Sequence, residues 1–173
     1  MANRAHVLPF ARLSPGDRVR FVSPASTPDR EACLARAAVL EGWGLRVDFG
    51  PHAFAEHGWY AGTDDQRLND LNQAFRDPEI RAVFATRGGR GSYRIADRLD
   101  FDAIRRDPKP LIGFSDITAL HMSLLHRLGL SGIHGALYGD EDGQDDPDNS
   151  AVLRQILFGS EEITYEARET EAT

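Results

Sequence analysis

The sequence predicts an α/β fold in which a parallel sheet is covered by helices on both faces. Short runs rich in β-branched and aromatic residues alternate along the chain with longer segments of helical periodicity. Because parallel strands need a crossover connection, this alternation is typical of a parallel sheet between two helical layers. The 173 residues, 41% of them hydrophobic, are enough for one domain with a sizeable core.

Strands are expected where β-branched, aromatic and other apolar residues form short runs. The first run, RVRFVS, alternates in polarity and follows the turn-forming sequence SPGD. RAVFAT is followed by the glycine loop RGGRGS, whereas KPLIGF runs directly into a helix. The expected strands are 18–23, 46–49, 81–86, 109–114, 131–134 and 162–165.

Helices are expected between the strands, where apolar residues recur at helical spacing. The first helix ends at Gly42 and Gly44 and contains Cys33, which we expect to be a small core residue. Thr63 is a favourable N-cap for the next helix, and Pro78 stops that helix. The expected helices are 29–43, 64–77, 92–99, 116–128 and 150–158, and a short turn is expected at 101–106.

Charge is unevenly distributed along the chain. The net charge of −7 argues against a nucleic-acid partner. Residues 1–139 contain 18 basic and 16 acidic residues, whereas residues 140–173 contain 2 basic and 11 acidic residues. The acidic run at 140–149 lacks the spacing and the closing glutamate of an EF-hand, so we expect a solvated loop there rather than a metal site.

The sequence does not indicate secretion or insertion into a membrane. A single cysteine cannot form an internal disulfide, and no run approaches the roughly 18 apolar residues of a membrane span. Charged residues and proline interrupt the N-terminal sequence MANRAHVLPFARL, which lacks the apolar region of a signal peptide. We therefore expect a cytoplasmic protein with no membrane partner.

Three loops are expected to meet at one edge of the sheet. The sequences SPAST, RGGRG and FSD follow the first, third and fourth expected strands. In open α/β sheets, ligands bind at the carboxyl ends of the strands, where these loops would gather. This edge is therefore the predicted site.

Ser115 lies at the junction of an apolar strand and an amphipathic helix, with almost no loop between them. A strand-to-helix turn this tight lifts its middle residue above the sheet, as in a nucleophile elbow, and Gly113 would permit close approach. The first amides of the helix would then stabilise an oxyanion. The alternative is that Ser115 only caps the helix, and the pattern G-x-S-x-G is incomplete because Ile117 replaces its second glycine.

The loop Arg87-Gly88-Gly89-Arg90-Gly91 is the second candidate functional segment, because its composition is typical of a site that binds an anion. Its three glycines allow positive φ angles and leave backbone amides available to an anion or an oxyanion. Its two arginines would hold a carboxylate or a phosphate. The loop matches neither the Walker pattern nor the dinucleotide fingerprint, and the alternative is a tight crossover turn without a ligand.

The histidines give weaker indications. His121 and His126 are five residues apart on the expected helix, which does not match the spacing of paired metal ligands. His121 lies roughly 9 Å along the helix axis from Ser115, so we expect it to pack in the core rather than to act as a general base. His134 lies at the end of an expected strand, and its role is left open. No group of Cys, His, Asp or Glu in the sequence has metal-ligand spacing.

Together these segments resemble the L,D-carboxypeptidase family of serine peptidases, which includes muropeptide carboxypeptidases and microcin C self-immunity proteins. The resemblance covers about 13–135 and implies a flavodoxin-like or class I glutamine amidotransferase-like sheet with the nucleophile on the strand-to-helix elbow. The matching segments are LSPGDRVRFVSPAS, WYAGTDDQRLNDLNQAF, ATRGGRGSYRIADRLDFDAI, PKPLIGFSDITALH and the following IHG.

The resemblance also implies roles for individual residues. It makes Ser115 the nucleophile, and it places the backbone amides of Asp116, Gly88 and Gly89 in the oxyanion hole. Arg87 matches the family loop and becomes a candidate for substrate binding.

The implied reaction is cleavage of an L–D amide bond through an acyl-enzyme, such as release of the terminal D-alanine of a murein tetrapeptide. No metal or organic cofactor follows from that mechanism. Peptide-nucleotide antibiotics are the alternative substrates within the family. The family usually has an aromatic residue where this chain has Arg90, which leaves the local substrate contact open.

The family places its remaining catalytic residues, a glutamate and then a histidine, in a second domain beyond residue 173. We therefore expect 1–160 to be the nucleophile domain, 161–173 to begin a linker, and the chain alone to be inactive. The resemblance further suggests a homodimer. Two competing hypotheses are a non-catalytic module that binds an anion or nucleotide through the glycine loop, and a half-enzyme completed by a separately encoded second half.

Overall fold

A five-stranded sheet, parallel throughout, forms the centre of the fold. The structure is a computed structural model and describes residues 8–135, 137 and 147–159. The strands lie in the flavodoxin-like order β2-β1-β3-β4-β5, which opens a crevice at the carboxyl ends of β1 and β3. The strands are β1 Arg18–Val22, β2 Arg46–Phe49, β3 Ile80–Ala85, β4 Leu111–Gly113 and β5 Ile133–His134.

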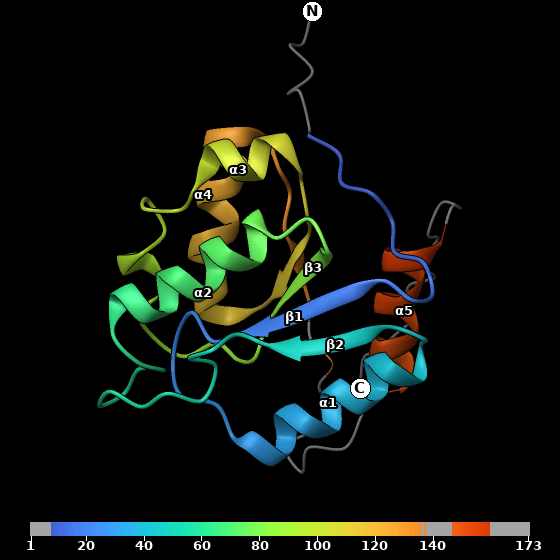
Figure 1. Ribbon diagram of the computed structural model, residues 1–173, viewed down its shortest axis with the longest axis horizontal. Helices are drawn as coiled ribbons and strands as arrows, with labels where there is room; N and C mark the ends of the chain where they lie inside the picture. Colours follow the sequence, from blue (N-terminus) through green and yellow to red (C-terminus); the bar gives the residue numbers. More distant parts are fainter. Residues whose placement is uncertain (1–7, 136, 138–146, 160–173) are drawn as a thin grey trace, which may run out of the picture.

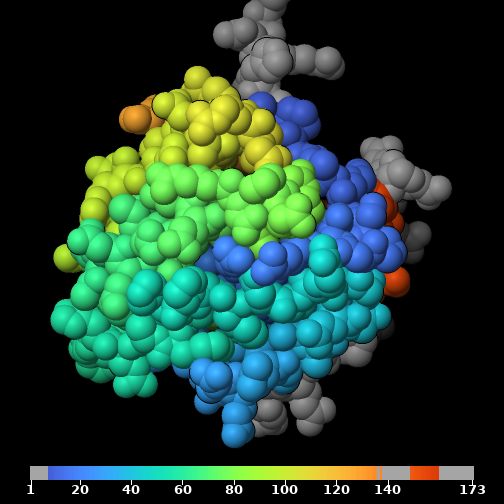
Figure 2. All heavy atoms as spheres, in the orientation of Figure 1, coloured from blue at the N-terminus to red at the C-terminus, as the bar shows by residue number. Residues whose placement is uncertain are grey.

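Helices cover both faces of this sheet. In Figure 1, α3 and α4 lie above β1 and β2, with α2 beside them, whereas α1 lies below and α5 to the right. Residues of α1 and α5 pack in one core layer, and residues of α2 and α4 pack in the other. Figure 2 shows the segment 50–63, coloured teal, on the surface between α2 and α1. The helices are α1 Arg30–Gly42, α2 Asp64–Arg76, α3 Phe101–Arg106, α4 Thr118–Leu128 and α5 Pro147–Phe158, and two short 3-10 turns are η1 Ser92–Arg94 and η2 Ser115–Ile117.

Alternating side chains of the central strands divide the core into two layers. On β3, Val83 packs in the layer that contains α2 and α4, whereas Phe84 packs in the layer that contains α1 and α5. Leu111 and Ile112 alternate in the same way on β4. Burial on both faces explains why these strands are almost continuously apolar in the sequence. Cys33 is fully buried on α1, as predicted.

Five of the predicted strands are confirmed, and the fourth and fifth are shorter than expected. β4 does not fill 109–114, because Pro110 has no N–H and the Lys109 side chain turns away toward the end of α2. There the buried ammonium group of Lys109 donates to three backbone carbonyls at 2.6–3.3 Å. The strand predicted at 162–165 lies outside the described residues.

The prediction of a helix at 92–99 is wrong. Only η1 forms there, and the chain then turns so that Ile95 and Leu99 pack into the core. Asp100 accepts a hydrogen bond from the Ala103 N–H (3.0 Å) and starts α3 where only a turn was expected. Tertiary packing therefore overrides the local helical pattern in this segment.

The remaining helix predictions are confirmed, with small shifts at their ends. Thr63 caps α2 as predicted, since its hydroxyl accepts from the Gln66 N–H (3.2 Å) while the Gln66 side chain accepts from the Thr63 N–H (2.9 Å). The helix predicted at 150–158 begins earlier, at Pro147. In the ranges that the structure describes, no helix has the length and apolar character needed to span a bilayer.

Candidate active site

The turn between β4 and α4 places Ser115 at the carboxyl edge of the sheet. β4 ends at Gly113, and η2 begins at Ser115 and leads directly into α4. Ser115 has φ 58°, and no other non-glycine residue within 8–135, 137 and 147–159 has a positive φ. This backbone conformation costs a non-glycine residue roughly 1–2 kcal/mol. The predicted elbow is therefore present, and the structure adds that its backbone is strained and that the Ser115 side chain is exposed.

Gly113 makes this turn possible. A Cβ added to Gly113 would lie 2.8 Å from Cγ2 of Ile117 and 3.0 Å from Cβ of Ala85. Since real Cβ atoms do not approach that closely, only glycine allows β4 and η2 to pack at this distance. The predicted close approach at residue 113 is confirmed.

Ser115 does not act as the helix cap. The N-cap position of η2 is Phe114, that of α4 is Ile117, and neither helix receives a hydrogen bond from a capping side chain. The alternative interpretation of Ser115 as an N-cap is therefore wrong. The helix 116–128 predicted from the sequence begins as the 3-10 turn η2 before α4.

The glycine loop lies directly against this serine. A Cβ added to Gly88 would lie 2.8 Å from Cβ of Ser115 and 3.1 Å from its Oγ. Gly89 has φ 114°, and an added Cβ there would overlap the Ser26 side chain. Glycine is therefore required at both positions, and it is the backbone of Gly88 that lies beside the Ser115 hydroxyl.

Hydrogen bonds hold the loop after β1 against the glycine loop. The Ser26 N–H donates to the Gly88 carbonyl (3.4 Å), and the Arg90 N–H donates to the Ser26 hydroxyl (3.2 Å). The Arg90 guanidinium lies over the exposed ring of Trp59, 6.0 Å from its centroid. The loops SPAST and RGGRG are therefore in contact, as their positions after neighbouring strands predict.

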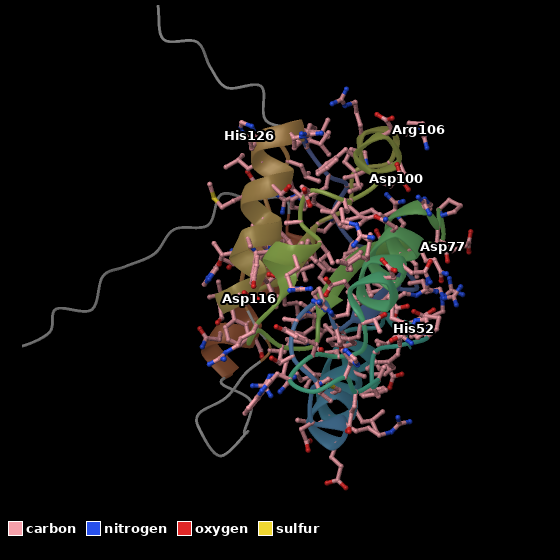
Figure 3. The ribbon with its side chains drawn as sticks, turned by 90° about the vertical axis from the view of Figure 1, so that its left-hand side faces the viewer. His52, Asp77, Asp100, Arg106, Asp116 and His126 are labelled. Carbon is pink, nitrogen blue, oxygen red and sulfur yellow. The ribbon has the colours of Figure 1, made fainter. Side chains whose placement is uncertain are left out.

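Asp116 joins the glycine loop to the serine turn. Its carboxylate accepts a hydrogen bond from the Ser92 N–H (2.8 Å), and its backbone carbonyl accepts one from the Ser92 hydroxyl (2.5 Å). Figure 3, which looks at this edge of the sheet, shows Asp116 and His126 at opposite ends of α4. All three predicted loops therefore meet at one place, and His126 lies away from it.

A cavity of about 390 Å³ opens beside Ser115. Its lining includes Arg87, whose Nη1 donates to the Thr27 carbonyl (3.3 Å). Gly88, Gly89 and Phe114 also line it. The structure therefore brings Ser115, Arg87 and the two glycines predicted for the oxyanion hole to one cavity.

Neither His121 nor His134 is among the residues that line the cavity beside Ser115. His121 is buried on α4, and its Nε2 lies 3.1 Å from the Leu111 carbonyl. Burial lowers the pKa of His121, and the hydrogen bond with Leu111 offsets only part of that effect. His134 is exposed on β5, with its ring centroid 6.5 Å from that of His121. His121 is therefore a packed core residue, as expected.

Arg36 is a residue of the cavity that sequence reasoning missed. It lies on α1, half-buried, and its Nη1 donates to the Thr86 carbonyl at the end of β3 (2.7 Å). Its place in the sequence, in the middle of a helix with other charged residues, gives no signal of this contact. α1 belongs to the crossover from β1 to β2, and the loop that follows β3 lies near it because β3 is the other neighbour of β1 in the sheet.

Arg67 is a second residue that sequence reasoning missed. It lies on α2 and binds the loops that follow β1 and β3. It is 1% exposed, and its Nη1 donates to the carbonyls of Pro24 (2.6 Å) and Gly91 (2.9 Å). Its Nη2 pairs with Asp64, and its guanidinium lies 5.1 Å from the centroid of the Tyr60 ring. One buried side chain thus connects the loop after β1 to the glycine loop.

The charge of Arg67 is compensated within this cluster. Burial alone would raise the pKa of Asp64, but a hydrogen bond from Arg94 and the charges of Arg67 and Arg94 outweigh it and lower that pKa below its usual value. Asp64 therefore stays ionised in the fold. Among the described residues, no group of His, Cys, Asp and Glu is arranged to hold a metal ion.

Comparison with known protein families identifies a match across the site. The family described as the LD-carboxypeptidase N-terminal domain matches residues 19–135. A probable murein peptide carboxypeptidase of Bacillus subtilis is 42% identical over 155 residues, which cover 88% of this chain and 48% of the relative. The murein tetrapeptide carboxypeptidase of Pseudomonas aeruginosa is 42% identical over 119 residues, which cover 68% of this chain and 38% of the relative.

Solved structures show the same fold. The microcin C7 self-immunity protein MccF in its wild-type apo state superposes with a TM-score of 0.80 at 27% sequence identity. The superposition covers 87% of this chain and 47% of MccF. The chain therefore spans about half the length of the relatives that it matches.

Proposed function

The chain belongs to the LD-carboxypeptidase family, and on that premise we propose that it supplies the nucleophile half of a serine-type L,D-carboxypeptidase. The observation that carries the proposal is the strained turn at Ser115 with the Gly88 backbone against its hydroxyl. The proposed substrate is a murein tetrapeptide that ends in D-alanine, by analogy with the tetrapeptide carboxypeptidase of Pseudomonas aeruginosa.

Ser115 acts as the nucleophile in this reaction. Its Oγ attacks the carbonyl carbon of the last peptide bond, and the backbone N–H groups of Asp116, Gly88 and Gly89 stabilise the oxyanion. The C–N bond then breaks, and the nitrogen takes up a proton and leaves as the amine of D-alanine. Water hydrolyses the resulting ester of Ser115, which regenerates the hydroxyl. The reaction consumes only water and calls for no cofactor.

The general base is supplied from outside this chain. An ordinary serine hydroxyl is a poor nucleophile until a base accepts its proton. In the described part of the chain, the nearest candidate on α4, His121, is buried against Leu111. The relatives are about twice as long as the matching segment, and we assign the base to a glutamate–histidine pair in that additional length. The 173-residue chain alone is then inactive.

Release of D-alanine from a murein tetrapeptide tests this proposal. The protein assayed is the chain extended through a second half of the length that the relatives have. Replacing the nucleophile in Ser115→Ala should reduce kcat by about 10⁴-fold or more. Ser131→Ala, at an exposed serine after α4, is the matched control and should retain the activity. Equal activity of Ser115→Ala and the parent protein would exclude Ser115 as the nucleophile.

A second candidate substrate is an acyl group linked to a nucleotide. It is favoured by the fold similarity to MccF in complex with aspartyl sulfamoyl adenosine, with a TM-score of 0.79 at 28% identity. The same catalytic groups would cleave such an amide. Comparing kcat/KM for a murein tetrapeptide and a peptide-nucleotide in the same assay decides between the two substrates.

A further inference from the structure

The cavity beside Ser115 carries more positive than negative charge. Its charged lining residues are Arg36, Arg87 and Asp29. The carboxylate of Asp29 is already engaged, because it caps α1 by accepting a hydrogen bond from the Ala32 N–H (2.7 Å). Two guanidinium groups, together with the N-terminal end of α1, therefore make this cavity favourable for an anion.

Backbone carbonyls hold both guanidinium groups in place. Arg36 donates to the carbonyl of Thr86 (2.7 Å), and Arg87 donates to the carbonyl of Thr27 (3.3 Å). Both charges also act on the buried thiol of Cys33. Burial raises the pKa of that thiol, and the two arginines oppose the rise. Both arginines line the cavity together with Pro28 and Asp29, the residues just before α1.

The rest of the lining suits a small residue at the end of a peptide. Pro28 and Phe114 contribute apolar surface, and Gly88 and Gly89 leave room beside Ser115. The carboxylate carbon of a terminal residue is two bonds away from the nitrogen of the last peptide bond. An anion held in this cavity therefore keeps that peptide bond close to a nucleophile on the same wall.

We propose that Arg36 and Arg87 form a seat for the terminal carboxylate of the leaving residue, and that this seat restricts cleavage to the last peptide bond. The inference rests on the proposed function, because it assigns the leaving-group side of the same site. A planar guanidinium group binds a carboxylate through charge-assisted and often bidentate hydrogen bonds. A substrate with its carboxylate blocked as an amide loses these bonds.

The seat can be tested on the 173-residue chain without catalysis. N-acetyl-D-alanine and its amide are titrated separately, and binding is followed by NMR through the side-chain Nε–Hε signals of the arginines. The acid should bind about 10- to 100-fold more tightly than the amide, and Arg36→Gln and Arg87→Gln should each remove most of that difference. Arg30→Gln is the matched control, because Arg30 lies on the same helix with its guanidinium over Phe54.

Two results of this titration would overturn the seat. One is equal binding of acid and amide, or no acid-dependent change of the signals at all. The other is unchanged preference in Arg36→Gln and Arg87→Gln. Inorganic phosphate is titrated as a third ligand, and tighter binding of phosphate than of N-acetyl-D-alanine would replace the carboxylate with a phosphoryl group as the occupant.

The extended protein separates this inference from the proposed function. The assay compares a tetrapeptide that ends in D-alanine with one that ends in D-alaninamide. The parent protein should prefer the free acid about 10- to 100-fold in kcat/KM, and Arg36→Gln should reduce that ratio toward one. Equal hydrolysis of both peptides by the parent contradicts the seat alone. If the extended parent protein shows no Ser115-dependent hydrolysis of either peptide, the proposed function is contradicted. The titration of the 173-residue chain then still tests whether Arg36 and Arg87 bind a carboxylate.

Discussion

Gly88 shows how the site depends on a missing side chain. An added Cβ would lie 2.8 Å from Cβ of Ser115 and 3.1 Å from the Phe114 carbonyl, so either the loop or the serine would have to move. We predict that Gly88→Ala lowers kcat of the extended protein by about 10²-fold or more, as expected when an oxyanion donor is displaced.

Gly42 provides the control for that substitution. It lies in α1, and an added Cβ would meet no atom within 4 Å. Gly42→Ala should therefore leave kcat unchanged and raise the free energy of unfolding by about 0.5–1 kcal/mol. Normal activity in Gly88→Ala would show that the loop backbone does not contact the transition state.

The strain at Ser115 predicts an unusual order of stability among its variants. At φ 58° the Cβ of any other residue is in steric conflict with the backbone, whereas glycine has no Cβ and adopts this conformation without strain. We predict that Ser115→Gly is more stable than Ser115→Ala by about 1 kcal/mol in urea unfolding of the chain. Ala38→Gly, at an exposed position of α1, is the control, because glycine is unfavourable inside a helix. Its free energy of unfolding should fall by about 1 kcal/mol. A Ser115→Ala variant as stable as Ser115→Gly would mean that the turn is unstrained.

His121 makes stability depend on pH near neutrality. Burial lowers its pKa below the ordinary 6.5, so the fold favours the neutral ring. Below about pH 6.5 the unfolded chain binds the proton more readily, and the free energy of unfolding should fall as the pH drops from about 7 to 5. His121→Asn should flatten this pH dependence in denaturant titrations. An equal slope in the variant would assign the dependence to other groups.

At the scale of elements, α2 supports the active-site loops through Arg67. Replacing its guanidinium removes the Arg67 hydrogen bond from the buried carbonyl of Pro24, and it leaves the buried carbonyl of Gly91 with the N–H of Arg94 (3.2 Å). We predict that Arg67→Met lowers the free energy of unfolding by about 2–4 kcal/mol, measured by urea unfolding. Arg98→Met, which removes only an exposed ion pair with Asp65, should cost less than about 1 kcal/mol. A similar small cost for both variants would contradict the bracing role.

The position of the three loops could be predicted from the sequence, because it follows from topology. Parallel strands place their carboxyl ends at one edge, so any loops after β1, β3 and β4 must gather there. The elbow at Ser115 was predictable for a similar reason, since a strand and a helix without a loop between them leave few conformations. The prediction of a helix at 92–99 was wrong, because Ile95 and Leu99 are buried in the core although the segment between them is not helical.

The roles of Arg36 and Arg67 could not be predicted from the sequence. Both side chains bind backbone carbonyls, and the partners are 24 to 50 residues away along the chain. A carbonyl exists at every residue, so such contacts leave no pattern of residue types. Only the packing of α1 and α2 against the sheet determines which carbonyls they reach.

At the scale of the whole molecule, the site lies where the strand order reverses between β1 and β3. The described elements provide a nucleophile turn, a glycine loop and a cavity, and the match covers about half of each relative. The arrangement fits a unit that performs catalysis together with further residues. The homodimer suggested by the family resemblance stays a prediction, which light scattering after size-exclusion chromatography can check.

Release of D-alanine by the 173-residue chain itself tests the central claim most directly. The chain and its extended form are incubated with the same murein tetrapeptide, each beside its Ser115→Ala variant. The account predicts release by the extended protein only, and no release above the buffer blank by the chain alone. Ser115-dependent release by the chain alone would contradict it, because the general base would then lie within these residues, and His121 and His134 would be the candidates.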